Sequence, residues 1–341
     1  MVNKIVTFGE IMMRLNPQGY LRFLQTTNYD VSFAGGEANV AVSLANFGEN
    51  VSFVSKVPNH EIGDSCVNSL RYYGVDISDI TRGGERLGAY FVEKGASQRA
   101  SKVIYDRKYS AVSLATANDF DWDKIFNGAT WFHFTGITPA LGGNLPKICL
   151  EACKRAKEKG IKISCDINYR GKLWSREDAN KVMSTLMPYV DVCIGNEADA
   201  SDVFALKAEN SDIEKGELNK AGYIGVAKQL SEKFNIATVA FTLRGSLSAS
   251  INTWAAMLYV DSKAYFSPQY TIQIVDRVGG GDSFSGGLVY SLINEYDEQE
   301  AINFAVAASC LKHTIEHDFN LVSLDEVKSL VAGNASGRVV R

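Results

Sequence analysis

The chain carries the stretch Asp276-Arg277-Val278-Gly279-Gly280-Gly281-Asp282-Ser283-Phe284, and the rest of the sequence can be arranged around it. An extended-looking run, residues 270–275, precedes this stretch, and a helical pattern, residues 283–296, follows it. Three consecutive glycines leave their backbone N–H groups free of side-chain hindrance, and the helix adds its positive N-terminal end. The stretch therefore predicts an anion hole for a phosphate, formed by Gly279, Gly280 and Gly281.

Asp282 is the residue in this stretch that does not suit a simple phosphate site. Its carboxylate would repel a phosphate unless it faces the attacking group, where it can orient a hydroxyl and accept the proton. The stretch therefore indicates phosphoryl transfer to an alcohol, with Asp282 as the catalytic base. The alternative is that Asp282 only caps the helix, as aspartate often does. Because Asp282 lies near a helix N-terminus, we expect it to be a weak base.

Two familiar phosphate-binding fingerprints are absent from the sequence. Gly171-Lys172 is followed by Leu173 where a Walker A loop requires Ser or Thr. The dinucleotide-binding pattern fails because Phe284 stands where its third glycine would be, and because the glycines lie late in the chain. A P-loop protein is therefore excluded, and a nicotinamide dehydrogenase is not favoured.

The composition is typical of a soluble globular protein that acts on a small molecule. Of 341 residues, 46% are hydrophobic, which is enough for a large core, and the formal net charge is -4. Basic and acidic residues are interleaved, so there is no basic footprint for nucleic acid. No apolar run reaches the ~20 residues of a membrane span, and residues 1–8 resemble a first strand more than a signal peptide. We therefore expect a cytoplasmic protein with no nucleic-acid or membrane partner.

The cysteines and histidines form no metal-binding pattern, since there is no Cys-x-x-Cys and no histidine pair at zinc spacing beside cysteines. The cysteines are Cys66, Cys149, Cys153, Cys165, Cys193 and Cys310. We interpret all six as buried or half-buried apolar residues in a reducing compartment. The four histidines are expected in the core or at helix ends.

Short apolar strands alternate with helical patterns through most of the chain. The predicted strands are residues 4–8, 51–57, 131–135, 161–166, 190–195 and 238–243. The predicted helices are residues 40–47, 62–73, 145–159, 177–187, 222–234 and 298–312. This alternation is typical of an α/β fold with a doubly wound, mostly parallel sheet and helices on both faces.

Two extended blocks, residues 12–33 and 88–110, interrupt the alternation. We expect them to form a small β-sheet, separate from the main one, that serves as a lid. Residues 1–331 would form a single domain that includes this lid, residues 207–220 a solvated surface insertion, and residues 332–341 a disordered tail. Because exposed sheets tend to pair, we also expect a homo-oligomer formed through the lid.

Polar residues follow several predicted strands, and ligands of such sheets bind beyond the carboxyl ends of the strands. These residues are Asp166, Asn168, Arg170, Asn196, Asp199, Arg244, Gly245 and Ser246. Near the start of the chain, Gly35-Gly36 would let a ligand approach the backbone, and Asn39 offers a donor and an acceptor to a polyol. Each residue alone has an alternative as turn or helix-cap chemistry, but their convergence favours a binding site.

With these residues assembled, the chain resembles the ribokinase-like (PfkB) carbohydrate kinases over nearly its whole length. The matching motifs are Gly35-Gly36 with Asn39, Asn196 with an acid three residues later, and Asp276-x-x-Gly-Gly-Gly-Asp282. The resemblance implies a ribokinase-like fold with a lid, in which the glycines bind the transferring phosphate and Asp282 activates a sugar hydroxyl. Two residues depart from the family pattern: Arg277 replaces a small residue, and Asp199, with its shorter reach, replaces Glu.

Within this family, Tyr90, Tyr105-Asp106-Arg107 and Arg170 resemble the corresponding residues of the 2-keto-3-deoxygluconate kinases. A sugar acid brings a carboxylate, which the guanidinium groups of Arg107 and Arg170 can bind with paired hydrogen bonds. The resemblance implies that Tyr90 and Tyr105 close over this substrate and that Asp318 contacts it as well. The alternative for Arg107 is an ion pair with a surface acid.

The resemblance also implies a cofactor arrangement. ATP would lie across the strand ends near Asn168 and Asn196 and along a loop at residues 243–248, and Mg²⁺ would be held by Asp199 and Asp276. The loop residues concerned are Leu243, Arg244, Gly245, Ser246 and Ser248. K⁺ would act as an activator near Asp276. The rival interpretations are a fructokinase, a kinase for another keto-sugar acid, and a non-catalytic nucleotide or sugar sensor.

Overall fold

The computed structural model describes residues 3–206 and 220–334. The predicted insertion, apart from Lys220, and residues 335–341 of the predicted tail lie outside the described residues. Lys220 begins helix α8 (Lys220–Phe234), and α11 (Leu324–Val331) ends just before the tail. Among the described helices, none combines the length and the apolar character that crossing a membrane requires.

The main sheet has ten strands within the described residues, in the order β13-β12-β11-β10-β9-β8-β1-β4-β5, with β14 paired to β12. Its strands from β11 through β10, β9, β8, β1 and β4 to β5 run parallel, whereas β12 pairs antiparallel with β11, β13 and β14. The bounds are β1 Lys4–Phe8, β4 Asn50–Val57, β5 Ile80–Arg82, β8 Ala129–Thr135, β9 Lys162–Asp166, β10 Val192–Gly195, β11 Thr238–Ser246, β12 Ile251–Val260, β13 Lys263–Phe266 and β14 Tyr270–Gln273.

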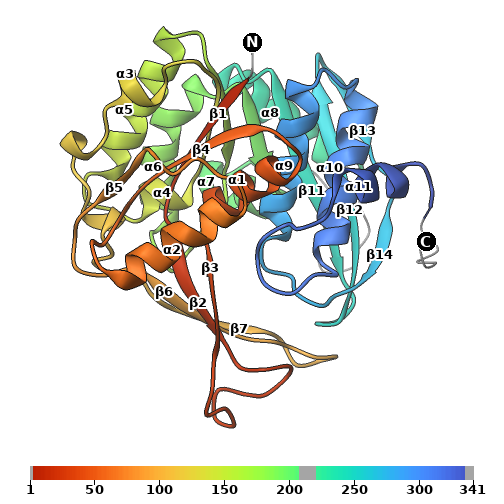
Figure 1. Ribbon diagram of the computed structural model, residues 1–341. Coiled ribbons are helices and arrows are strands. Elements are labelled where there is room, and N and C mark those ends of the chain that lie inside the picture. The colour runs from red at the N-terminus through yellow and green to blue at the C-terminus, as the bar shows by residue number, and fades with distance from the viewer. Residues whose placement is uncertain (1–2, 207–219, 335–341) are drawn as a thin grey trace.

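Helices cover both faces of this sheet (Figure 1). Successive side chains of a strand point to opposite faces, so Ile5 of β1 packs in one apolar cluster with Leu288 of α9 and Val306 of α10. Its neighbour Val6 packs in the other cluster, with Ile148 of α5. The bounds are α1 Gly36–Asn46, α2 Glu61–Tyr72, α3 Trp122–Ile125, α4 Ile137–Ala140, α5 Leu145–Glu158, α6 Arg176–Leu186, α7 Glu197–Phe204, α9 Gly280–Ile293 and α10 Glu298–Lys312, with short 3-10 turns at Val112–Leu114, Ala117–Asp119 and Met187–Tyr189. The predicted doubly wound α/β fold is confirmed.

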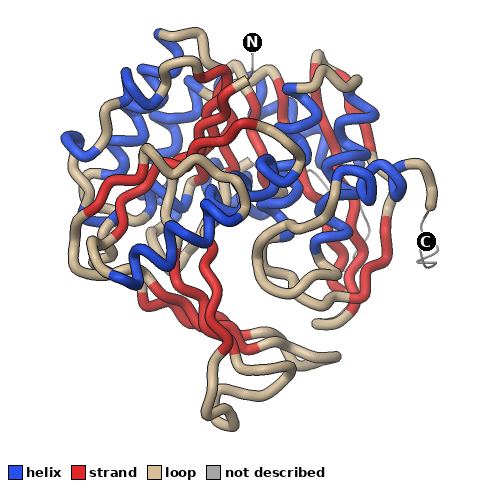
Figure 2. The backbone as a smooth tube through the Cα atoms, viewed as in Figure 1, coloured by secondary structure: helices blue, strands red, loops and turns tan. Residues whose placement is uncertain are grey.

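A second sheet, which we call the small sheet, projects from the main body (Figure 2). Its strands are β2 Met12–Asn16, β3 Asp30–Ala34, β6 Ala89–Glu93 and β7 Lys102–Asp106, in the order β3-β2-β6-β7. The pairs β2–β3 and β6–β7 are antiparallel hairpins, and β2 joins them by running parallel to β6. The separate sheet predicted from the two extended blocks is thus confirmed.

The predicted loop at residues 243–248 is wrong over most of its length. Strand β11 continues to Ser246 because β12, which the sequence reasoning missed, gives it an antiparallel partner: Arg244 pairs with Trp254, and Ser246 with Asn252. The predicted burial of the cysteines is confirmed, since five are buried and Cys310 is half-buried, and the reducing compartment stays a prediction.

Candidate active site

A cavity of about 580 Å³ lies between the small sheet and the carboxyl ends of β9, β10 and β11. It gathers most of the predicted site residues: Gly35, Gly36, Asn39, Tyr90, Tyr105, Arg107, Asn168, Arg170, Asn196, Asp199, Arg244, Gly279, Gly281, Asp282 and Asp318. Gly280, Leu243, Gly245, Ser246, Ser248 and Asp276 do not line it. A second hollow, of about 680 Å³ between α3 and α5, contains none of the predicted residues.

The three glycines at the start of α9 have different surroundings. Gly279 adopts a left-handed backbone (φ 82°), and a Cβ there would lie 2.1 Å from the carbonyl oxygen of Asp318. A Cβ on Gly280 would lie 2.4 Å from the ring of His313, whereas one on Gly281 would meet nothing within 4 Å. Close packing therefore requires glycine at the first two positions, and Gly281 borders open space.

Backbone amides at this turn are available to an anion. Within residues 3–206 and 220–334, the N–H groups of Gly279, Gly281 and Asp282 have no hydrogen-bond acceptor. Because α9 begins at Gly280, three residues earlier than the pattern suggested, these amides belong to its first turn and carry its positive end. The turn therefore has the geometry of an anion hole.

Asp282 lies half-buried in the first turn of α9, at the wall of the cavity. The amide of Asn39, on α1, donates to its Oδ2 atom over 2.6 Å, and Gly36 of the same helix borders its other oxygen. Loss of hydration raises the pKa of Asp282 to about 6, although the hydrogen bond from Asn39 lowers it. The expectation of a weak base is therefore wrong, because desolvation outweighs the hydrogen bond from Asn39 and the positive charges of Arg170 and Lys312.

Two further carboxylates face the cavity at the strand ends. Asp166 ends β9 and accepts the N–H of Asn168, while Asp199 of α7 accepts the N–H of Tyr169. Burial raises the pKa of Asp199 to about 6, and burial together with the charge of Asp199 raises the pKa of Asp166 well above its usual value. Neither forms an ion pair within the described part of the chain.

These two carboxylates fit a hydrated Mg²⁺, which is bound in proteins through one or two carboxylates plus substrate phosphates. The described residues contain no group of three potential ligands that would form a complete protein cage. Asn196, which caps α7 by accepting the N–H of Asp199, keeps that carboxylate at the cavity edge. Asp276, the other predicted magnesium ligand, does not line the cavity.

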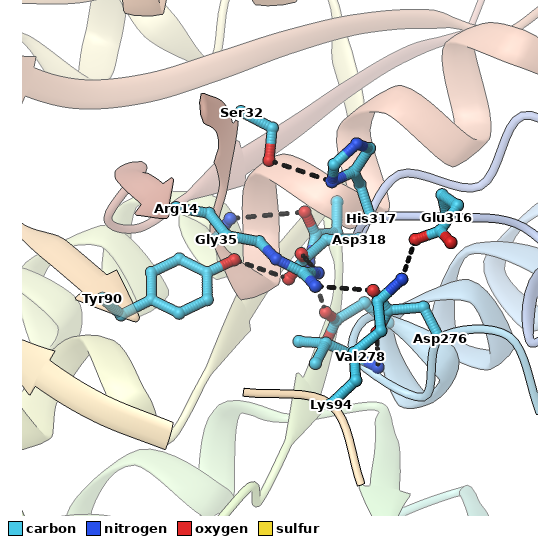
Figure 3. A network of polar contacts seen from close by, with 12 residues as sticks. Arg14, Ser32, Gly35, Tyr90, Lys94, Asp276, Val278, Glu316, His317 and Asp318 are labelled. Carbon is cyan, nitrogen blue, oxygen red and sulfur yellow. Dashed lines mark hydrogen bonds and ion pairs between the residues drawn. The ribbon is translucent and has the colours of Figure 1, made fainter. Parts of the chain in front are cut away.

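Asp276 belongs instead to a buried ionic network beneath the small sheet (Figure 3). Arg14 of β2, which is fully buried, donates to Asp276 Oδ2 and to Asp318 Oδ1 over 2.5 Å each, and the Tyr90 hydroxyl donates to Asp318 Oδ2 over 2.8 Å. Burial lowers the pKa of Arg14, but the charges of Asp318 and Asp276 raise it by more. The network joins the small sheet to the loop that leads into the anion hole.

Sequence reasoning missed Arg14. The available signal was the strand alternation, because Arg14 falls on the same inward face as Met12 and Asn16, where a charged side chain requires a partner.

Arg107 lines the cavity but already has a carboxylate partner. Its Nε atom donates to Glu10 over 2.7 Å, Nη2 binds the same oxygen, and Nη1 has no partner within the described residues. The alternative of an ion pair between Arg107 and a surface acid is therefore right about the ion pair and wrong about the acid, because Glu10 is buried. The Tyr105 ring stacks on Tyr90, with centroids 5.9 Å apart, and lies under the Arg107 guanidinium.

Arg170 makes no ion pair in the described residues and donates only to the carbonyl of Tyr169.

Residues 2–316 match the family model described as pfkB family carbohydrate kinase. The chain is similar to the crystal structure of 2-dehydro-3-deoxygluconokinase from Thermotoga maritima, with 49% identity, a TM-score of 0.94 and coverage of 98% of this chain and 99% of that one. It is 32% identical to 2-dehydro-3-deoxygalactonokinase of Haloferax volcanii over 99% of each chain. A structure from Escherichia coli in complex with ATP and Mg²⁺ has 21% identity and a TM-score of 0.81, covers 97% of this chain and 100% of that one, and shares the fold alone.

Proposed function

The chain belongs to the pfkB family of carbohydrate kinases, and we propose that it transfers the γ-phosphate of ATP to the terminal hydroxyl of 2-keto-3-deoxygluconate. The observation that carries this proposal is the position of Asp282, whose carboxylate lies beside the unpaired amides of the α9 turn in a cavity that is also lined by four arginines, two of which are Arg107 and Arg170. The name of the 49% identical Thermotoga maritima enzyme supports the same substrate.

In the proposed reaction, Asp282 accepts the proton of the sugar hydroxyl while the hydroxyl oxygen forms a bond to the γ-phosphorus of ATP. The bond between the γ-phosphorus and the β-phosphate oxygen breaks at the same time, and ADP is released. The amides of Gly279, Gly281 and Asp282 hold the charge that develops on the transferring group. The raised pKa of Asp282, about 6, suits a base that is deprotonated at neutral pH yet accepts a proton readily.

Asp166 and Asp199 would hold the Mg²⁺ that accompanies ATP, and the ion supplies charge neutralisation to the phosphates. Both carboxylates lack an ion-pair partner among the described residues, which supports this assignment. Asn168, Asn196 and Arg244 border the same part of the cavity and are proposed to contact the nucleotide. The nucleotide contacts predicted for Leu243, Gly245, Ser246 and Ser248 stay predictions, and the side chain of Leu243 packs in the core.

The substrate carboxylate is proposed to bind between Arg170 and Arg107. Arg170 has donors to spare, and Arg107, oriented by Glu10, keeps its Nη1 atom for the ligand. A neutral sugar offers no charge to these groups, so an acid is favoured. The Haloferax volcanii relative is named for the galactonate counterpart, and the two sugar acids differ only in configuration at a carbon that bears a hydroxyl.

We further propose that residues 1–331 act as one cytoplasmic kinase domain, with the small sheet as the lid of the cavity. Tyr90, Val103 and Tyr105 of β6 and β7 line the cavity, which supports the lid. A homo-oligomer formed through this sheet stays a prediction, for which the exposed apolar residues Val31 and Ile104 are the support.

The experiment that tests the proposal is ADP release from ATP and Mg²⁺ with 2-keto-3-deoxygluconate, 2-keto-3-deoxygalactonate, fructose and ribose. We expect kcat/KM for the keto acids to exceed that for fructose and ribose by ~100-fold or more, because a neutral sugar would leave the cationic donors of Arg170 and the Nη1 atom of Arg107 without a charged partner. Arg170→Ala should raise KM for the acids, whereas Arg176→Ala, an exposed arginine on α6, should not. Preference for fructose or ribose would contradict the sugar-acid proposal, and ATP binding without turnover would support the sensor alternative.

A further inference from the structure

Lys312, the last residue of α10, is fully buried and its ammonium group is bound by backbone carbonyls. The Nζ atom donates to the carbonyl oxygen of His317 over 2.6 Å, to that of Asp276 over 3.3 Å, and to that of Val278. An ammonium group has three N–H donors, so all of them are used. Lys312 forms no direct ion pair with a carboxylate in the described part of the chain.

The three carbonyls belong to two loops that meet at the anion hole. Asp276 and Val278 lie immediately before Gly279, and His317 lies immediately before Asp318, whose carbonyl packs against Gly279. Figure 3 shows Asp276, Val278 and His317 gathered around the buried network of Arg14. Burial lowers the pKa of Lys312, but the nearby charges of Asp276 and Asp318 oppose this effect and favour the ammonium form.

A ring of uncharged carbonyl oxygens around one positive charge is the type of site that proteins use to hold K⁺. The sequence suggested K⁺ as an activator near Asp276, but a K⁺ ion does not fit here, because the ammonium group of Lys312 already takes these oxygens.

Fixing the carbonyl of Val278 also fixes the first amide of the anion hole. The C=O of Val278 and the N–H of Gly279 belong to one planar peptide group and point in opposite directions. When Lys312 binds the oxygen, the N–H of Gly279 is directed away from Lys312, and this N–H has no acceptor among the described residues. A cation on the oxygen also polarises the peptide group and strengthens its N–H as a donor.

We propose that Lys312 is a built-in monovalent cation that positions the anion hole, so that phosphoryl transfer by this chain requires no added K⁺. This inference rests on the proposed kinase function. Lys312 is a positioning residue, since it acts on the phosphate through the peptide group of Val278 and Gly279 and touches no reacting atom.

The test compares kcat of wild type, Lys312→Ala and Lys312→Met in choline, Na⁺ and K⁺ chlorides at equal ionic strength. Lys312→Ala leaves room for an ion, whereas Lys312→Met fills the same space without a charge. Wild type should vary less than about twofold, and both variants should lose on the order of 100-fold in kcat in choline, the effect of losing one anion-hole donor. K⁺ should restore Lys312→Ala at least about tenfold and should not restore Lys312→Met, an outcome that no merely structural role explains. Lys328→Ala, an exposed lysine on α11, is the control.

A second readout does not depend on activity. K⁺ should raise the thermal unfolding midpoint of Lys312→Ala, because an ion that binds only the folded state stabilises it, and should leave that of wild type and Lys312→Met unchanged. If wild type phosphorylates none of the sugar acids, the proposed function fails, and this measurement still decides whether the carbonyl ring is a cation site. Activation of wild type by K⁺ beyond about fivefold, or unchanged kcat in Lys312→Ala, would overturn the inference. If Lys312→Ala does not fold, the inference is decided by the response of wild-type kcat to K⁺ and by the kcat of Lys312→Met.

Discussion

Four aspartates in and around the candidate site form two groups that differ in whether the protein supplies a cationic partner. Asp276 and Asp318 lie in the network beneath the small sheet, where Arg14 binds both of them. Asp282 and Asp199 line the cavity, where neither forms an ion pair within the described residues, and burial raises the pKa of each to about 6. The first group is already neutralised by the protein, and the second is left to be neutralised by a proton, a metal ion or a substrate.

This difference teaches how one residue type serves two purposes in a single site. A carboxylate held by a buried cation has a fixed direction and a compensated charge, so it can position a loop. A carboxylate that has lost water without gaining a direct ion pair is a poised base or metal ligand, and its burial makes the folded state less stable. Substitutions in the two groups should therefore change stability in opposite directions.

The largest expected effect is that of Arg14→Met, which leaves Asp276 and Asp318 buried without their shared cation. Breaking a buried ion pair by removing one partner costs about 3–5 kcal/mol of unfolding free energy. Urea unfolding measures it, with Arg86→Met as the control, because Arg86 pairs with Asp106 at the surface and such pairs contribute less than about 1 kcal/mol. If both variants lose the same small amount, the network does not hold the aspartates as described.

The next effect separates two glycines that the sequence makes look alike. Gly279→Ala should lose about 2 kcal/mol or more, because alanine resists a left-handed backbone and its Cβ would collide with the carbonyl of Asp318. Gly281→Ala meets no atom within 4 Å and should stay within about 0.5 kcal/mol of wild type. Thermal unfolding of the two variants measures the difference. An equal loss of unfolding free energy at both positions would contradict the surroundings described for the turn.

Asp282→Asn should change stability in the opposite direction to Arg14→Met. The folded-state pKa of Asp282, about 6, lies above the unfolded value of about 4, so the folded state binds more protons between these values and its stability falls as the pH rises through them. Above pH 6 the asparagine variant should be more stable than wild type by on the order of 1 kcal/mol, and at pH 4 the two should be equal. Denaturant midpoints at pH 4 and 7.5 provide the comparison, and a variant that is less stable at pH 7.5 would disprove the raised pKa.

Tyr90→Phe should have the smallest effect on stability, and it tests whether this residue of the small sheet serves the buried network or the ligand. The hydroxyl of Tyr90 donates to Asp318, and losing one such bond costs about 1 kcal/mol of unfolding free energy. We expect this loss together with a KM for the sugar acid that changes little. Unchanged stability with a raised KM would show instead that the hydroxyl serves the ligand.

The fold could be predicted from the sequence because its signals are local. Strand and helix periods, and three glycines before an apolar helix, are visible within windows of ten to fifteen residues. Strand β12 was not predicted because its pairing partner β11 continues beyond the end of β10, and the sequence pattern does not show this continuation. The turn that holds Asp282 was recognised, but the pKa of Asp282 depends on how the folded chain buries it and on a hydrogen bond from Asn39 of α1, some 240 residues earlier.

The cations that organise the site could not be predicted, because their partners are distant in sequence. Arg14 meets Asp318 across 304 positions and Asp276 across 262. Lys312 ends a helix that is buried over most of its length, and nothing in that helix indicates that its ammonium group reaches three carbonyls of neighbouring loops. A backbone carbonyl has no signature in the sequence, so a site built from carbonyls becomes visible only in the structure.

The most direct test of the central claim, that Asp282 is the base, is single-turnover phosphoryl transfer by wild type and Asp282→Asn at saturating ATP and sugar acid. A positioned base contributes about 10²–10⁴-fold, so the rate should fall by roughly 10³ while the Kd for ATP is unchanged. In wild type, kcat/KM should fall as the pH drops below about 6. If Asp282→Asn retains more than about a tenth of the wild-type rate, Asp282 is not the base and the account is contradicted.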